Sequence, residues 1–150
     1  MQFRRLIMAL FGLVSLTCCA LLPRLTDPQV ASLADKVNSD AGAFFADLAA
    51  KSDKDCGFAE NAAAYDHLTE LAAALKAHIS VSKGSPALLL ASDALLRTLA
   101  DARAAHAAAS AKVDDLYGAC MAPGAIALNA EAVARASKAI AATQLIEGAQ

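Results

Sequence analysis

Apolar residues recur at steps of three and four along four stretches of this chain, and short turns separate these stretches. This period places the apolar side chains on one face of a helix. Alanine, the best helix former, supplies about 40 of the 150 residues, while tryptophan is absent. Strand-like alternation is confined to residues 79–82, where the end of a helix explains it equally well. The chain is therefore predicted to be all-α.

The predicted helices cover residues 28–51, 58–81, 86–117 and 123–146. Two of them begin with a capping side chain followed by proline, Asp27-Pro28 and Ser85-Pro86, an arrangement favoured at helix N-termini. The last helix could restart at Asn129 as an N-cap. Short connections make successive helices antiparallel, so residues 26–150 are expected to form an up-down-up-down four-helix bundle.

Each predicted helix has an expected core face. These faces are Val30, Leu33, Val37, Ala41, Phe44 and Leu48; then Tyr65, Leu68, Ala72, Leu75 and Ile79; then Leu89, Leu95, Leu96, Leu99, Ala102, His106, Ala109, Val113 and Leu116; and finally Val133, Ala136, Ile140 and Leu145. Alanine side chains bury little area, and burial contributes roughly 25 cal/mol per Å². A bundle of this composition would benefit from a covalent cross-link.

The N-terminus has the layout of an export signal. Arg4 and Arg5 precede an apolar run of about 11 residues, Leu6 to Leu16, and a small-residue cluster follows at residues 17–20. The run is shorter than the ~20 apolar residues of a transmembrane helix. We expect residues 1–20 to act as a signal peptide, which places the mature chain in the bacterial envelope on the periplasmic side.

Two kinds of processing fit this segment. In one, residues 16–18 act as a lipobox, and Cys19 carries a lipid and becomes the mature N-terminus, although Cys18 stands where Gly, Ala or Ser is usual. In the other, an ordinary signal peptidase cuts after Ala20. An uncleaved anchor or a cytosolic chain are the remaining alternatives. Residues 21–25 would form a short tether, and the lipid would attach the protein to a membrane.

The other two cysteines, Cys56 and Cys120, lie in the first and third turns. In an up-down-up-down bundle these turns meet at the same end, so the topology brings the thiols together. Export supplies an oxidising compartment, and a disulfide is expected. Closing a loop of about 65 residues would stabilise the fold by roughly 4 kcal/mol on the chain-entropy model.

The charge balance disfavours nucleic-acid binding. Outside residues 1–20 the chain has 11 Lys and Arg residues and 15 Asp and Glu residues, without a basic stripe. Neutralising phosphates requires concentrated Lys and Arg. Electrostatic attraction to an acidic membrane surface is disfavoured for the same reason.

The histidines do not form a metal motif. His67 and His78 would lie about 16 Å apart along one helix, and the chain lacks the His-x-x-x-His and Glu-x-x-His spacings. It also lacks Cys-x-x-Cys-His, and Met121 in a turn is the only methionine beyond the signal, which argues against haem. We expect these two and His106 to be ordinary surface or part-buried side chains.

No pattern of catalytic groups emerges from the remaining residues. Asp66 and His67 are adjacent and would point about 100° apart on a helix. The acidic pairs Asp53/Asp55 and Asp114/Asp115 are expected to be solvated, and Tyr65 and Tyr117 to be core aromatics with hydroxyls at the rim. Phe58 or Tyr117, near the cross-linked end, is the best candidate for a recognition spot. We expect no catalytic residue, no metal and no cofactor.

The chain resembles small α-helical lipoproteins of bacterial envelopes. The resemblance lies in Cys19, in Cys56 ahead of Phe58 and Tyr65, and in Cys120 three residues before Pro123. That group has no established activity, so the resemblance implies a location and a disulfide only. The sequence favours a non-enzymatic envelope protein that binds another envelope component, possible partners including an envelope protein, through a helical face or the cross-linked end. The alternative is a carrier that holds an apolar molecule or haem inside the bundle.

Overall fold

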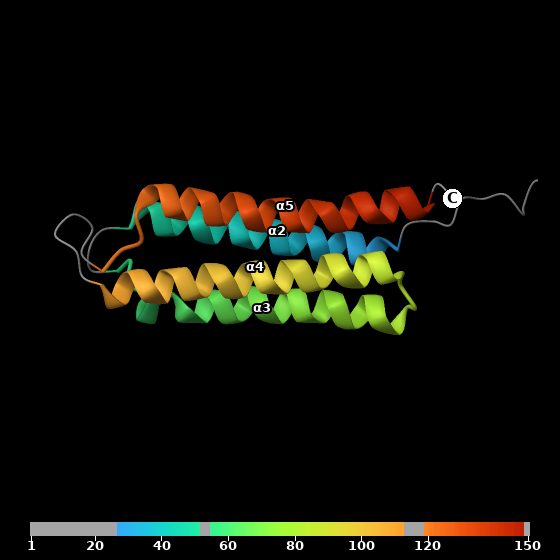
Figure 1. The fold of residues 1–150 in the computed structure, drawn as a ribbon, viewed down its shortest axis with the longest axis horizontal. Coiled ribbons are helices and arrows are strands. Elements are labelled where there is room, and N and C mark those ends of the chain that lie inside the picture. Colours follow the sequence, from blue (N-terminus) through green and yellow to red (C-terminus); the bar gives the residue numbers. More distant parts are fainter. Residues whose placement is uncertain (1–26, 52–54, 113–118, 149–150) are drawn as a thin grey trace, which may run out of the picture.

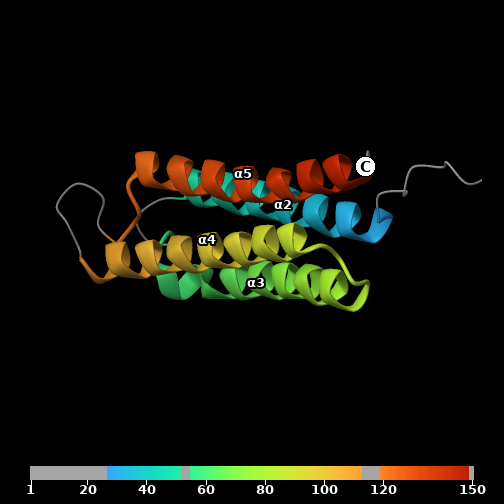
Figure 2. The ribbon, with the colours of Figure 1, turned by 45° about the vertical axis from the view of Figure 1, so that its right-hand side comes forward.

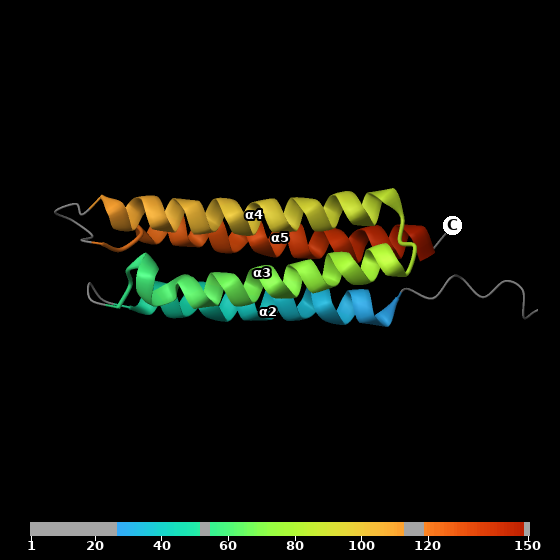
Figure 3. The same ribbon diagram turned by 90° about the horizontal axis from the view of Figure 1, so that it is seen from below.

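The structure is a computed structural model that describes residues 27–51, 55–112 and 119–148. Within these ranges the helices are α2 (Pro28–Ala50), α3 (Phe58–Val81), α4 (Pro86–Ala111) and α5 (Pro123–Gly148). They run antiparallel in chain order (Figure 1), and α2 and α4 each pack against both α3 and α5. Figures 2 and 3 show the resulting two-by-two bundle from other sides. The predicted all-α, up-down-up-down fold is confirmed.

The bundle has two ends of different construction. The end of α2, the start of α3, the end of α4 and the start of α5 form the cross-linked end, which contains Cys56 and Cys120. The opposite end, here called the Asp27 end, contains Asp27, the α3–α4 connection and the end of α5. None of the described helices combines the length and apolarity needed to span a membrane.

The helix starts follow the predicted caps. The Asp27 carboxylate accepts from the amides of Gln29 and Val30 at 2.9 and 3.4 Å, and the Ser85 hydroxyl accepts from the amide of Leu88 at 3.1 Å. The helix α5 is continuous from Pro123, as predicted, and the alternative of a restart at Asn129 is wrong. Proline at the first position is sufficient there, because it needs no hydrogen-bond acceptor for an amide and its backbone already favours the helix.

The α3–α4 connection is a tight turn that requires a glycine. Lys83 adopts a left-handed conformation with φ 55°, and the Gly84 amide donates to the Ile79 carbonyl at 2.8 Å. A β-carbon on Gly84 would lie 2.5 Å from Cγ2 of Ile79 and 2.9 Å from its carbonyl oxygen. Glycine is therefore the residue that lets the chain cross over the end of α3.

The core face of α3 is the one predicted, because Tyr65, Leu68, Ala72, Leu75 and Ile79 are all buried. Four of the six residues predicted for the core face of α2, Val30, Val37, Ala41 and Leu48, are buried, and the prediction is wrong at the other two positions. Ala34 and Phe45 are buried, while Leu33 and Phe44 are only partly buried. Adjacent residues differ by about 100° around a helix, and here both members of each pair are apolar, so either face fits the sequence period.

Two expectations for α4 and α5 are also wrong. The helix α4 ends at Ala111, with Lys112 as its C-cap, rather than near Tyr117; Val113, Leu116 and Tyr117 lie outside the described residues. In α5, Leu145 is 67% exposed and Gln144 takes the inward position. The Gln144 side chain donates to the Asp27 carbonyl at 3.2 Å, and this hydrogen bond explains why a polar residue occupies the core.

Candidate functional site

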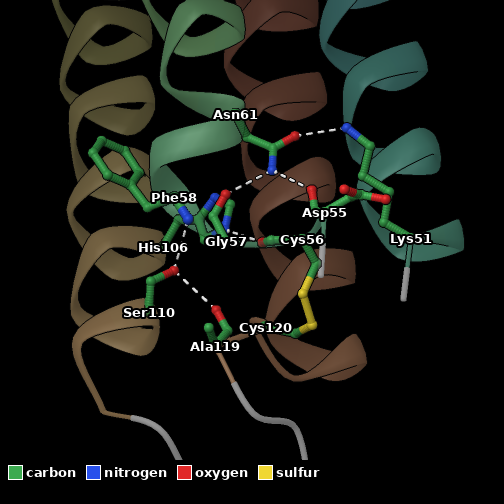
Figure 4. The surroundings of a disulfide bond; sticks show 10 residues. All are labelled: Lys51, Asp55, Cys56, Gly57, Phe58, Asn61, His106, Ser110, Ala119 and Cys120. Carbon is green, nitrogen blue, oxygen red and sulfur yellow. Dashed lines mark hydrogen bonds between the residues drawn. A yellow bond between two sulfur atoms is a disulfide. The ribbon is translucent and has the colours of Figure 1, made fainter. Parts of the chain in front are cut away.

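The disulfide between Cys56 and Cys120 joins the segments that lead into α3 and α5 (Figure 4). The two Cα atoms are 5.1 Å apart, within the usual range for a disulfide. The bond confirms the pairing predicted from topology. Disulfides persist in oxidising compartments, so this one indicates an extracytoplasmic location.

A buried asparagine organises the turn that contains Cys56. The Asn61 side-chain amide donates to the carbonyls of Asp55 and Gly57 at 3.0 and 2.7 Å, and its oxygen accepts from Nζ of Lys51 at 2.8 Å (Figure 4). The polar atoms of a side chain that is 3% exposed are thereby satisfied. Sequence reasoning missed Asn61, although its position one helical turn before Tyr65 on the core face of α3 was the available signal.

His106 holds the same turn from α4. Its side chain is fully buried, and Nε2 donates to the Cys56 carbonyl at 2.8 Å. A carbonyl oxygen only accepts, so Nε2 carries the hydrogen. The placement of His106 on the predicted core face of this helix is confirmed, whereas the expectation of a surface or part-buried histidine is wrong. The ring is inside the bundle because it supplies the donor that the Cys56 carbonyl needs.

Ser110, one helical turn after His106, connects both cysteine segments to α4. Its hydroxyl accepts from the Phe58 amide at 2.8 Å and donates to the Ala119 carbonyl at 2.9 Å (Figure 4). One side chain thus bonds to the residue two positions after Cys56 and to the residue before Cys120. Nothing in the apolar period marked this serine, because its role depends on which backbone groups the two turns leave unpaired.

An aromatic cluster lies behind the disulfide. Its members are Phe44, Phe45, Phe58, Tyr65 and His106, and the centroids of neighbouring rings are 4.8 to 6.3 Å apart. Tyr65 is fully buried, so its hydroxyl does not reach the rim as expected. Within the described residues, neither this hydroxyl nor Nδ1 of His106 has a hydrogen-bond partner. Burial also raises the pKa of the Tyr65 phenol.

The outward side of this cluster is the expected recognition spot at Phe58. The Phe58 ring is partly buried, and the guanidinium of Arg103 lies 5.6 Å above its centroid. Arg103 also pairs with Asp66. Phe58 therefore lies beside an ion pair, with the Arg103 guanidinium over its ring. Tyr117, the other candidate, lies outside the described residues.

His67 and His78 bind α3 to α2. Nε2 of His67 is 3.0 Å from the Asp40 carboxylate, and Nε2 of His78 is 2.9 Å from that of Asp27. Hydrogen bonds from His67 and Lys36 hold the pKa of Asp40 below its ordinary value.

In the described ranges, His, Cys, Asp and Glu side chains do not gather in groups of three or more that could hold a metal ion. Asp55 is exposed, while Asp53, Asp114 and Asp115 lie outside the described residues.

Asp27 is expected to make stability depend on pH. The hydrogen bond from His78 is the main reason that the pKa of this carboxyl lies below 3.8, and partial burial opposes it. As the pH falls, Asp27 is therefore protonated in the unfolded chain before it is protonated in the folded chain. The contribution of Asp27 to the unfolding free energy is complete above pH 3.8, the ordinary pKa, and is lost as the pH falls through the lower pKa of the folded state.

The variant D27N tests this contribution, because asparagine caps a helix as well as aspartate does but does not titrate. The difference in unfolding free energy between wild type and D27N should shrink as the pH falls from about 4 to about 2. Urea unfolding at a series of pH values measures this difference, and parallel curves would contradict the role of Asp27.

Comparison of the chain with family models, with curated proteins and with solved structures found no match. The resemblance to envelope lipoproteins stays a prediction, and Cys19, the predicted lipidation site, lies outside the described residues. The geometry of the cross-linked end carries the functional argument.

Proposed function

We propose that this chain is a non-enzymatic protein of the bacterial envelope that is exported, is anchored through a lipid on Cys19, and binds another envelope protein through its cross-linked end. The observation that carries the proposal is the Cys56–Cys120 disulfide. It fits the export signal, since oxidising compartments preserve disulfides. It also fixes two chain segments next to the partly buried Phe58.

The polar side chains of the bundle are used in contacts between its helices and turns, which supports binding rather than catalysis. His67, His78 and His106 each make a hydrogen bond that joins two parts of the bundle. A general base or nucleophile must be free to come within hydrogen-bond reach of a substrate. These imidazoles hold helices and turns together, and the pair of Asp66 with Arg103 does the same between α3 and α4.

A native mass spectrum of the exported product, expressed from the full-length sequence, tests the proposal. The expected mass lacks residues 1–18, includes a diacylglycerol on Cys19, and is two hydrogens lighter because of the disulfide. An unprocessed chain, or two reactive thiols without denaturant, would refute export and cross-linking. A mass that begins after Ala20 would refute the lipid anchor and leave a soluble periplasmic product.

A photo-crosslinking residue at Leu128 tests the binding face. Leu128 is 66% exposed and lies near the start of α5, at the cross-linked end. The matched control is Leu90, which is 65% exposed near the opposite end. A discrete crosslinked protein from the first position and not from the second is expected in intact cells. Equal products from both positions, or none from either, would count against this face.

The alternative is a small-ligand carrier that holds an apolar molecule or haem. It is favoured by the two polar atoms in the interior, the Tyr65 hydroxyl and His106 Nδ1, which have no partner among the described residues. A ligand with one donor and one acceptor group would satisfy both. Retention of a small molecule in the native mass spectrum would support the carrier and displace the first proposal.

The variant Y65F separates the two functions. Without a ligand, removing an unsatisfied buried hydroxyl should leave the unfolding free energy unchanged or raise it by about 1 kcal/mol. Chemical unfolding of purified wild type and Y65F measures this. A loss of more than about 1 kcal/mol would show that the hydroxyl has a partner, as the carrier function requires.

A further inference from the structure

The Asp27 end exposes a group of large apolar side chains. Among the described residues the exposed large apolar side chains are Val81, Leu90, Leu128, Leu145 and Ile146, and all except Leu128 lie near this end. Their exposed fractions range from 63% to 84%. We call Val81, Leu90, Leu145 and Ile146 the apolar collar. A concentration of exposed apolar surface marks an interaction site.

The collar is shallow. Val81 is the last residue of α3, Leu90 lies four residues after the start of α4, and Leu145 lies three residues before the end of α5. At 1.5 Å per residue, all four side chains start within about 6 Å of the helix ends. Protein segments that lie in a membrane interface are buried by about 5 to 10 Å, so the depth of the collar fits a lipid surface.

Among the described residues, charges in this layer are few and mostly paired. Glu147 accepts a hydrogen bond from Ser85, and Asp27 pairs with His78. Lys83, exposed in the α3–α4 turn, has a long side chain that can keep its ammonium group among lipid headgroups. The next inter-helix ion pair, Lys76 with Asp93 at 2.6 Å, lies further from the end.

The position of Asp27, where the described chain begins, indicates what the apolar collar contacts. The described chain begins at Asp27, at the same end as the collar. If Cys19 carries the lipid, only residues 20–26 separate the membrane from the bundle, and seven residues span at most about 25 Å. This step rests on the proposed lipid anchor.

We propose that the apolar collar inserts into the lipid surface, so that the bundle stands upright on the membrane. The helices of 23 to 26 residues then carry the cross-linked end roughly 35 Å away from the lipid. Apolar insertion rather than charge attraction drives the contact, in agreement with the acidic composition. The membrane fixes which end of the protein faces a partner.

Single tryptophan variants of the full-length chain test this orientation, because the natural sequence contains no tryptophan. L90W and L145W place an indole in the collar, and L128W places one near the cross-linked end at a site of equal exposure. Each exported protein is reconstituted into vesicles of phosphatidylethanolamine and phosphatidylglycerol with or without bromine on the acyl chains near the headgroup. Circular dichroism verifies that each variant folds.

Bromine should reduce the fluorescence of L90W and L145W by about twofold, because the collar reaches the acyl boundary, and should leave L128W unchanged at low and high salt. No quenching in the collar variants, or equal quenching in all three, would overturn the inference. Fluorescence of L90W that depends on protein concentration and not on bromine would overturn it by identifying a second copy as the occupant.

Mass spectrometry of the N-terminal peptide distinguishes failure of the lipid anchor from failure of the membrane orientation. A lipid on Cys19 without selective quenching refutes the orientation and leaves the anchor intact. Selective quenching in a chain without the lipid refutes the anchor and supports insertion by the collar alone.

Discussion

Removing the Cys56–Cys120 disulfide with the double variant C56A/C120A is expected to lower the unfolding free energy by about 4 kcal/mol on the chain-entropy model. The two residues are 64 positions apart, so the bond closes a long loop in the unfolded chain. Denaturant unfolding under oxidising conditions measures the loss. Marginal domains have only about 5–15 kcal/mol in total, so the variant should unfold at a much lower denaturant concentration.

Reduction provides the control for this prediction. Wild type treated with a reductant should approach the stability of C56A/C120A, and the double variant should not respond to reductant. The variant S110A, which removes the hydroxyl between the Phe58 amide and the Ala119 carbonyl, should cost only about 1–3 kcal/mol with the disulfide intact. A loss below about 1 kcal/mol in C56A/C120A would mean that packing alone holds this end together.

The sequence was sufficient to predict the bundle and its cross-link, because both depend on signals of long range. Four apolar periods with short connections allow few topologies, and the topology brings Cys56 and Cys120 together. The face of α3 was also predictable, since polar or small residues flank the buried positions from Tyr65 to Ile79, with Leu71 as the exception. Export and lipidation stay predictions that concern residues outside the described ranges.

The polar contacts of the cross-linked end could not be predicted in the same way. Asn61, His106 and Ser110 are inward because particular carbonyls and amides of the turns lack partners in the backbone. Which groups are left unpaired depends on the path of the turns, and the apolar period carries no information about it. The inward position of Gln144 has the same cause, because its partner is the Asp27 carbonyl far away in the chain.

The face of α2 that enters the core is open to a direct mutational test. Phe45 is 2% exposed, whereas Phe44 is partly buried. The variant F45A is expected to lower the unfolding free energy by about 3–5 kcal/mol, the usual effect of emptying a buried phenylalanine site. The variant F44A should lose about half as much, since solvent already reaches part of its ring.

The comparison between F44A and F45A is informative because the two side chains share chemistry, helix and neighbours. Both rings contact Tyr65, with centroids 4.8 Å away for Phe44 and 6.3 Å for Phe45. Edge contacts between rings contribute only about 0.5–1.5 kcal/mol beyond burial, so burial should decide the order even though Phe44 is the closer ring. Urea unfolding of both variants measures the order. A larger loss in F44A would place Leu33 and Phe44 deeper in the core than Ala34 and Phe45. It would require α2 to turn about its axis by less than the ~100° between adjacent residues, since Val30, Val37 and Leu48 belong to both faces.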